Sequence, residues 1–178
     1  YLYAYFFNFG VAAEKLGQLQ RATHMWEQAL ALKDDRPVLH QNLGVAYARQ
    51  GRLPMAREHL QRALALDESY AQAHFNLGNL LYREGELDGA LAAFAKAIDT
   101  DSQLSGAWQG LGNVHFNRAQ WPEALAAYRQ ALALDPGLAS VAFNMAKIHI
   151  QTDAPDSAIA ALRRVMALAP EDVEALYL

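Results

Sequence analysis

One segment of the chain, residues 37–70, shows the pattern on which the rest of the sequence is built: it reads PVLHQNLGVAYARQGRLPMAREHLQRALALDESY. Two stretches with helical spacing of apolar residues are separated by Gly51, and Pro37 and Pro54 lie near their starts. Proline is tolerated in the first turn of a helix, where its missing N–H costs little. Glycine supplies the positive φ that is wanted just beyond a helix end. The segment therefore predicts two helices joined by a tight turn.

The same pattern recurs along the chain with a period of 34 residues. The pair Leu43-Gly44 returns as Leu77-Gly78 and again as Leu111-Gly112. An alanine marks the second stretch of each unit: Ala22, Ala56, Ala90, Ala124 and Ala158. A large residue follows each alanine four positions later: Trp26, Leu60, Phe94, Tyr128 and Leu162. Because one helical hairpin cannot bury its apolar face alone, the repetition predicts a stack of hairpins, which is a solenoid.

The period and the marker positions resemble those of the tetratricopeptide repeat (TPR) family. The register gives five repeats and the start of a further helix: 3–36, 37–70, 71–104, 105–138, 139–172 and 173–178. The resemblance implies an all-α TPR solenoid of stacked antiparallel helix pairs, with eleven helical segments in a right-handed superhelix. We expect residues 1–178 to form a single TPR domain. Because the chain begins with Tyr1 and ends with Leu178 inside an apolar pattern, we also expect it to be part of a longer protein.

Two turns depart from the repeat. Gly17, Gly51 and Gly85 lie between the two helices of the first three repeats, whereas the fourth and fifth have Ala119 and Asp153 there. A positive φ at alanine costs about 1 kcal/mol. We therefore expect these two turns to have a different shape.

Composition and charge exclude several classes of function. The net charge of −4, from 19 acidic against 15 basic residues, argues against a nucleic-acid partner. The chain has no cysteine, which excludes disulfides and thiolate metal sites and is compatible with both the cytoplasm and the bacterial periplasm. No apolar run reaches the roughly 20 residues of a membrane span, so we expect no membrane insertion.

The sequence also gives no set of residues for catalysis, and we expect neither enzyme activity nor a cofactor. His40 and His74 share one repeat position, and His115 and His149 share another. Equivalent positions in neighbouring repeats lie roughly 8–10 Å apart, which is too far for two ligands of one zinc ion. The acidic cluster of Glu84, Glu86 and Asp88 is better explained by solvation and by the start of a helix than by acid–base chemistry.

The resemblance implies that ligands bind the concave surface lined by the first helix of each repeat. Asparagines recur on these helices and resemble the asparagine ladder of the TPR superhelix of O-linked N-acetylglucosamine transferase, which grips extended peptide backbone. The alternative is that they serve local hydrogen bonds, and Gly110 interrupts the row. The candidate peptide-binding residues are amides, aromatic residues and bases: Asn8, Asn42, Asn76, Asn79, Asn113, Asn144, Phe75, Tyr82, Phe116, Lys15, Arg49, Arg83 and Lys147.

These residues favour a non-catalytic scaffold that binds a peptide or protein segment in its groove. Two alternatives stay open: a substrate-targeting arm of a larger glycosyltransferase or sulfotransferase, and an assembly factor of the bacterial envelope. The amino-terminal helix adds a further expectation, because six of its first nine residues are aromatic: Tyr1, Tyr3, Tyr5, Phe6, Phe7 and Phe9. A surface helix normally has one apolar stripe. We therefore expect other sequence, a ligand or a second copy of the chain to cover this helix.

Overall fold

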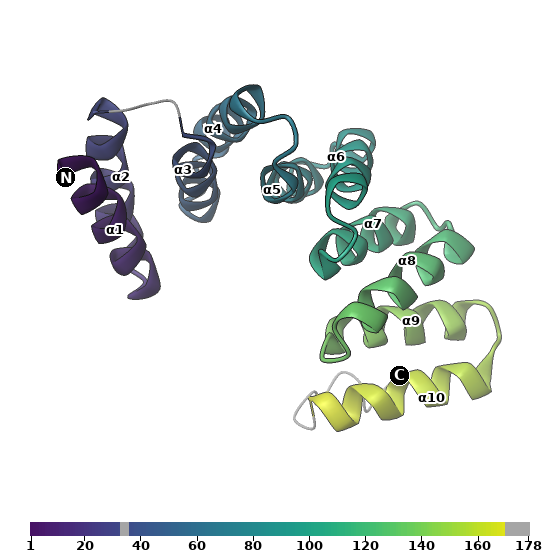
Figure 1. Ribbon diagram of the computed structural model, residues 1–178. Coiled ribbons are helices and arrows are strands. Elements are labelled where there is room, and N and C mark those ends of the chain that lie inside the picture. Colours follow the sequence, from purple (N-terminus) through teal and green to yellow (C-terminus); the bar gives the residue numbers. More distant parts are fainter. Residues whose placement is uncertain (33–35, 170–178) are drawn as a thin grey trace. The chain divides into compact units, whose positions relative to one another are not determined.

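The computed structural model describes residues 1–32 and 36–169. Every regular element in these residues is an α-helix, as predicted (Figure 1). The ten helices are α1 (Leu2–Lys15), α2 (Leu19–Leu32), α3 (Pro37–Arg49), α4 (Leu53–Leu66), α5 (Ala71–Arg83), α6 (Leu87–Thr100), α7 (Ser105–Asn117), α8 (Trp121–Leu134), α9 (Ala139–Gln151) and α10 (Pro155–Leu168). The expected start of an eleventh helix, at 173–178, lies outside the described residues.

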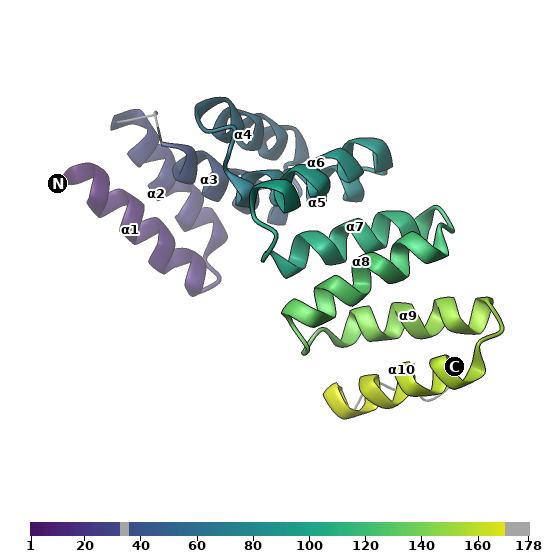
Figure 2. The ribbon, with the colours of Figure 1, turned by 45° about the vertical axis from the view of Figure 1, so that its right-hand side comes forward.

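Each odd-numbered helix packs most extensively against the helix that follows it, so α1–α2, α3–α4, α5–α6, α7–α8 and α9–α10 are hairpins (Figure 2). The chain divides into two compact units, Tyr1–Thr100 and Asp101–Leu178, which we call the amino-terminal and carboxy-terminal units and describe separately. Within the amino-terminal unit α2 packs on α3 and α4 on α5, and within the carboxy-terminal unit α8 packs on α9. Hairpins therefore stack on their neighbours, which is the solenoid that the period predicts. The single domain and the right-handed sense of the superhelix stay predictions.

The helices of each hairpin approach closely at the glycine of the Leu-Gly pair. A Cβ added to Gly44 would lie 2.7 Å from Cγ of Leu60, and one added to Gly78 would lie 2.7 Å from two ring atoms of Phe94. Leu60 and Phe94 are fully buried. Glycine is required at these positions because no side chain fits between the helix and the large residue that covers it.

The turns within the hairpins share one backbone conformation. Gly51 has φ of 77° and Gly85 has 79°, while Ala119 has 55° and Asp153 has 53°. Our expectation that the last two turns differ in shape is wrong. The hydrogen bonds also correspond: Gly51 N–H donates to Ala48 O, and Ala119 N–H donates to Phe116 O. The packing of the hairpins outweighs the local cost of a positive φ at a residue with a Cβ.

Ala119→Gly is therefore expected to raise the free energy of unfolding by about 0.5–1 kcal/mol, because relief of strain exceeds the entropy gained by the unfolded chain. Thermal melting followed by circular dichroism measures the change. Ala126→Gly is the matched control, since Ala126 is an exposed residue inside α8. There the same substitution should lower stability by about 1 kcal/mol. A loss of stability in both variants would contradict the strain argument.

The amino-terminal helix α1 is apolar on more than one side. Tyr3, Phe6 and Phe7 pack against the core of the amino-terminal unit, whereas Tyr1 and Tyr5 are exposed. Tyr5 lies against neighbouring rings of its own helix, with ring centroids 5.4 Å from Phe6. The helix thus has a core-facing stripe and additional exposed aromatic rings. Its coverage by a second copy of the chain stays a prediction.

Candidate functional site

The first helices of the amino-terminal unit carry the predicted basic row, and its members link neighbouring repeats. Arg49 on α3 donates a hydrogen bond to Glu14 on α1, with 3.3 Å between Nη1 and Oε1. Arg83 on α5 donates to the carbonyl oxygen of Ala48 on α3 at 3.1 Å. Lys15 is exposed in the last turn of α1. Equivalent residues of consecutive first helices therefore lie side by side, and both arginines remain solvent-exposed beside them.

The asparagines of this unit differ in their burial. Asn8 is exposed, while Asn42, Asn76 and Asn79 are half-buried. The Nδ2 atom of Asn76 is covered and has no hydrogen-bond partner among the described residues. A buried donor without a partner costs about 1–3 kcal/mol. Asn76 thus holds an unused hydrogen-bonding group on a first helix.

The asparagines of the carboxy-terminal unit already have partners. The Oδ1 atom of Asn113 accepts hydrogen bonds from the Tyr128 hydroxyl at 2.8 Å and from Nδ2 of Asn144 at 3.3 Å. Nδ2 of Asn144 also lies 3.2 Å from the Tyr128 hydroxyl oxygen. This network joins α7, α8 and α9. For Asn113 and Asn144 these local hydrogen bonds account for the asparagines without a ligand.

The predicted aromatic residues also lie in different surroundings. Phe75 is half-buried, with its ring centroid 6.2 Å from that of Phe94, and Tyr82 is half-buried in the last turn of α5. In the carboxy-terminal unit Phe116 makes an edge-to-face contact with Trp121 at 5.5 Å between ring centroids. Lys147 holds its ammonium group 4.3 Å from the ring centroid of Phe143. Trp121 was not selected from the sequence. The signal was available, because leucine occupies the equivalent position in three other repeats and tryptophan departs from it.

The contacts of the histidines do not follow the repeat positions that they share. Nδ1 of His40 on α3 lies 3.0 Å from Nδ1 of His59 on α4, whereas His74 contacts the carbonyl oxygen of Glu68. Burial, and then the charge of His40, lower the pKa of His59 below its ordinary value. The two rings therefore share a hydrogen bond in which at least one Nδ1 is unprotonated. No group of three metal-ligating side chains occurs in the described parts of the chain.

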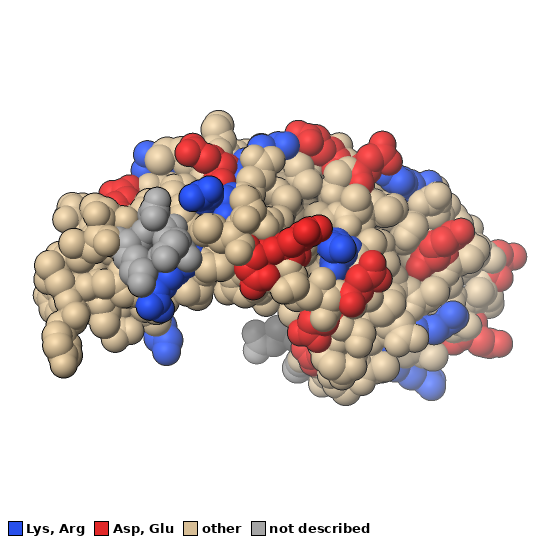
Figure 3. All heavy atoms as spheres, turned by 45° about the horizontal axis from the view of Figure 1, so that its top comes forward, with Lys and Arg blue, Asp and Glu red and all other residues tan. Residues whose placement is uncertain are grey.

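The charges around the site are otherwise mixed. Glu84 and Glu86, part of the acidic cluster, both pair with Arg57 on α4 at 2.5 Å. Burial and a hydrogen bond to Glu27 raise the pKa of Tyr47 to about 12, so its hydroxyl stays protonated as a donor. Figure 3 shows basic and acidic side chains interspersed on the face that it draws, with uncharged surface between them. Among the described helices none is long and apolar enough to cross a membrane.

Comparison with known families and structures agrees with this geometry. A tetratricopeptide repeat family model matches residues 7–68 and 42–105, and a second model of the same description matches residues 116–178. The search of curated proteins found no match.

Solved structures share the fold at low sequence identity. The chain is similar to PilF of Pseudomonas aeruginosa, with a TM-score of 0.90, 20% identity, and coverage of 98% of this chain and 80% of that chain. It is similar to a chain of the APC/C hetero-tetramer Cut9–Hcn1, with a TM-score of 0.87 and 21% identity over 97% of this chain. It spans only 34% of that chain. YrrB, described as a TPR protein with an unusual peptide-binding site, gives a TM-score of 0.75 and 20% identity over 97% of this chain and 89% of its own.

Proposed function

Because this chain belongs to the tetratricopeptide repeat family, whose members generally serve as non-catalytic scaffolds for protein–protein interaction, we propose that it binds an extended peptide segment of a partner protein. The proposed surface is the first-helix face of the amino-terminal unit, formed by α1, α3 and α5. The observation that supports this surface most directly is at Asn76: its Nδ2 donor is covered and has no partner among the described residues. The contrast with Asn113 and Asn144, whose amides bond to each other, supports a ligand role for Asn76.

The chemistry of an asparagine suits peptide backbone. A side-chain amide both donates and accepts, so it pairs with a peptide N–H and C=O whatever the peptide sequence. Asn42 stands one repeat before Asn76. Neighbouring helices pack roughly 8–10 Å apart, and an extended chain rises about 3.3 Å per residue, so the two amides would contact the peptide about three residues apart. Asn76 as a whole is half-buried, so rotation of its side chain presents the amide to the ligand.

The neighbouring residues would set the preference for the peptide. Phe75 and Tyr82 would supply apolar area, with Asn8 and Asn79 as further amides. Lys15, Arg49 and Arg83 would favour acidic segments, because they place basic groups on one side of an acidic protein. Arg49 and Arg83 already bind neighbouring helices, so their contribution would be long-range attraction, which salt screens.

The test is the double variant Asn42→Ala with Asn76→Ala. Peptides selected from a random library on the full chain serve as probes, and calorimetric titration measures their affinity. Two neutral hydrogen bonds of about 1 kcal/mol each correspond to a loss of about ten- to thirty-fold. Asn76→Ala alone should at the same time raise the melting temperature, because it removes a buried donor that has no partner.

The matched control is Gln28→Ala with Gln61→Ala, which removes two exposed amides from the second helices α2 and α4. We expect this variant to bind the selected peptides as the parent chain does. Unchanged affinity in the asparagine variant, or an equal loss in both variants, would show that the peptides do not bind the first-helix face of this unit.

A further inference from the structure

The carboxy-terminal unit contains an apolar recess beside the first helix α9. Its volume is about 360 Å³, and it is lined by Phe116, Trp121, Lys147, Ile150 and Gln151. Phe116 lies in the last turn of α7, Trp121 begins α8, and the other three residues belong to α9. Ligand pockets for whole small molecules span about 300–1,000 Å³. A recess at the lower end of this range fits one large side chain.

Trp121 is what distinguishes this recess from the equivalent places in other repeats. The second helices α2, α4 and α6 begin with leucine: Leu19, Leu53 and Leu87. At Trp121 the indole extends to Phe116 and forms an aromatic wall with it, at 5.5 Å between centroids. Ile150, which also lines the recess, is 43% exposed. Removing exposed apolar surface of this kind from water favours the binding of an apolar side chain.

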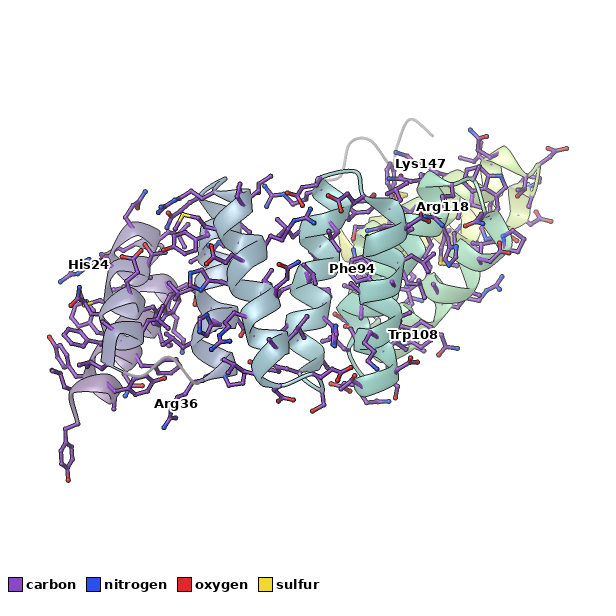
Figure 4. The ribbon with its side chains drawn as sticks, turned by 90° about the horizontal axis from the view of Figure 1, so that it is seen from above. His24, Arg36, Phe94, Trp108, Arg118 and Lys147 are labelled. Atoms are coloured by element: carbon purple, nitrogen blue, oxygen red, sulfur yellow. The ribbon has the colours of Figure 1, made fainter. Side chains whose placement is uncertain are left out.

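The rim of the recess is cationic. Lys147 stands where the preceding repeats have uncharged residues: Val11, Val45, Asn79 and Asn113. Its ammonium group lies over the Phe143 ring, 4.3 Å from the ring centroid, and Lys147 is labelled in Figure 4. None of the five lining residues is acidic, and Gln151 adds an amide. The charge of the site therefore complements a carboxylate next to an apolar group.

We propose that this recess binds an aromatic or aliphatic side chain of a partner peptide, with an aspartate or glutamate beside it in the peptide. The apolar side chain packs between Trp121, Phe116 and Ile150. The neighbouring carboxylate accepts hydrogen bonds from the Lys147 ammonium group and the Gln151 amide. The inference rests on the proposed function, because the recess is taken to hold one anchor residue of the partner.

The experiment titrates the full chain with three fluorescent peptides and follows anisotropy and the Trp121 indole N–H signal by NMR. The first probe is Gly-Ser-Asp-Phe-Asp-Ser-Gly. The second replaces both aspartates with lysine, and the third replaces phenylalanine with glycine. We expect the first to bind and to shift the Trp121 signal, and each of the other two to bind about ten-fold more weakly. No binding of the first probe at concentrations on the order of 1 mM would overturn the proposal.

Two variants give the matched tests. Trp121→Leu introduces the residue of the first three repeats, so the hairpin keeps its packing, and should weaken the first probe at least about five-fold. Lys147→Asn, which restores the residue of two preceding repeats, should remove the preference for aspartate over lysine. Unchanged affinity in Trp121→Leu, or an unchanged preference in Lys147→Asn, would overturn the proposal.

The asparagine variant of the amino-terminal unit separates this inference from the proposed function. If Trp121→Leu weakens binding of the first probe while Asn42→Ala with Asn76→Ala weakens binding of no selected peptide, the recess proposal is supported and the asparagine surface is contradicted. If Trp121→Leu has no effect while the asparagine variant weakens its peptides, the reverse holds.

Discussion

A Gly78→Ala variant is expected to lose about 2 kcal/mol of its free energy of unfolding. The added Cβ would lie 2.7 Å from Cδ1 and Cε1 of Phe94, and the ring of Phe94 is only 1% exposed. A buried ring in a packed hairpin cannot swing aside, so α5 and α6 must move apart. Overpacking of this severity costs about 3 kcal/mol, and the better helix propensity of alanine returns about 1 kcal/mol. Urea unfolding followed by circular dichroism measures the difference.

A second substitution tests the cause. The fifth repeat has Ala146 and Leu162 at the positions of Gly78 and Phe94. Phe94→Leu alone should cost about 1 kcal/mol, but combined with Gly78→Ala it recreates the pair of the fifth repeat. The double variant should therefore be more stable than the sum of the single effects by at least about 1 kcal/mol.

Gly89→Ala is the control for this series. Gly89 lies on α6, and a Cβ there would meet only the end of the flexible Leu81 side chain, at 3.2 Å. This variant should be as stable as the parent or gain up to about 1 kcal/mol. Strictly additive effects of Gly78→Ala and Phe94→Leu would show that the ring contact is not the reason for the glycine.

Trp26→Ala is expected to unfold the first hairpin while the rest of the amino-terminal unit stays folded. Trp26 is fully buried against Gly10, and its indole N–H donates to the carbonyl oxygen of Phe7 at 3.2 Å. Truncating a buried tryptophan costs about 3–5 kcal/mol. In a solenoid each repeat is stabilised only by itself and its neighbours, so the loss falls mainly on α1 and α2.

Hydrogen exchange measured by mass spectrometry distinguishes local from global unfolding. Amides of α1 and α2 should lose their protection, whereas those of α5 and α6 should exchange as in the parent chain. Leu32→Ala serves as the control, because Leu32 lies on the same helix and is 49% exposed. The Leu32→Ala variant should change the protection of the α1 and α2 amides against hydrogen exchange only slightly. Equal loss of protection in α1 and α6 would mean that the unit unfolds as one body.

The sequence determined the helices and their pairing, because these depend on contacts that repeat every 34 residues. First helices begin at Pro37, Ala71, Ser105 and Ala139, at the starts of the predicted repeats. Ala119 and Asp153 show the limit of this reasoning. Their local preference argued for a different turn, but hairpin packing across the whole repeat imposes the same positive φ.

The partners of the polar side chains were decided only by the tertiary structure. Spacing placed Asn76, Asn113 and Asn144 on first helices, but it gave all three the same expected role. Asn113 and Asn144 bond to each other, while Nδ2 of Asn76 has no partner among the described residues. The physical reason is the precision that each kind of contact requires. The repeat period fixes backbone positions to within a helix spacing, whereas a hydrogen bond needs its donor and acceptor within about 3 Å. Side-chain rotamers and neighbouring residues decide whether that distance is reached.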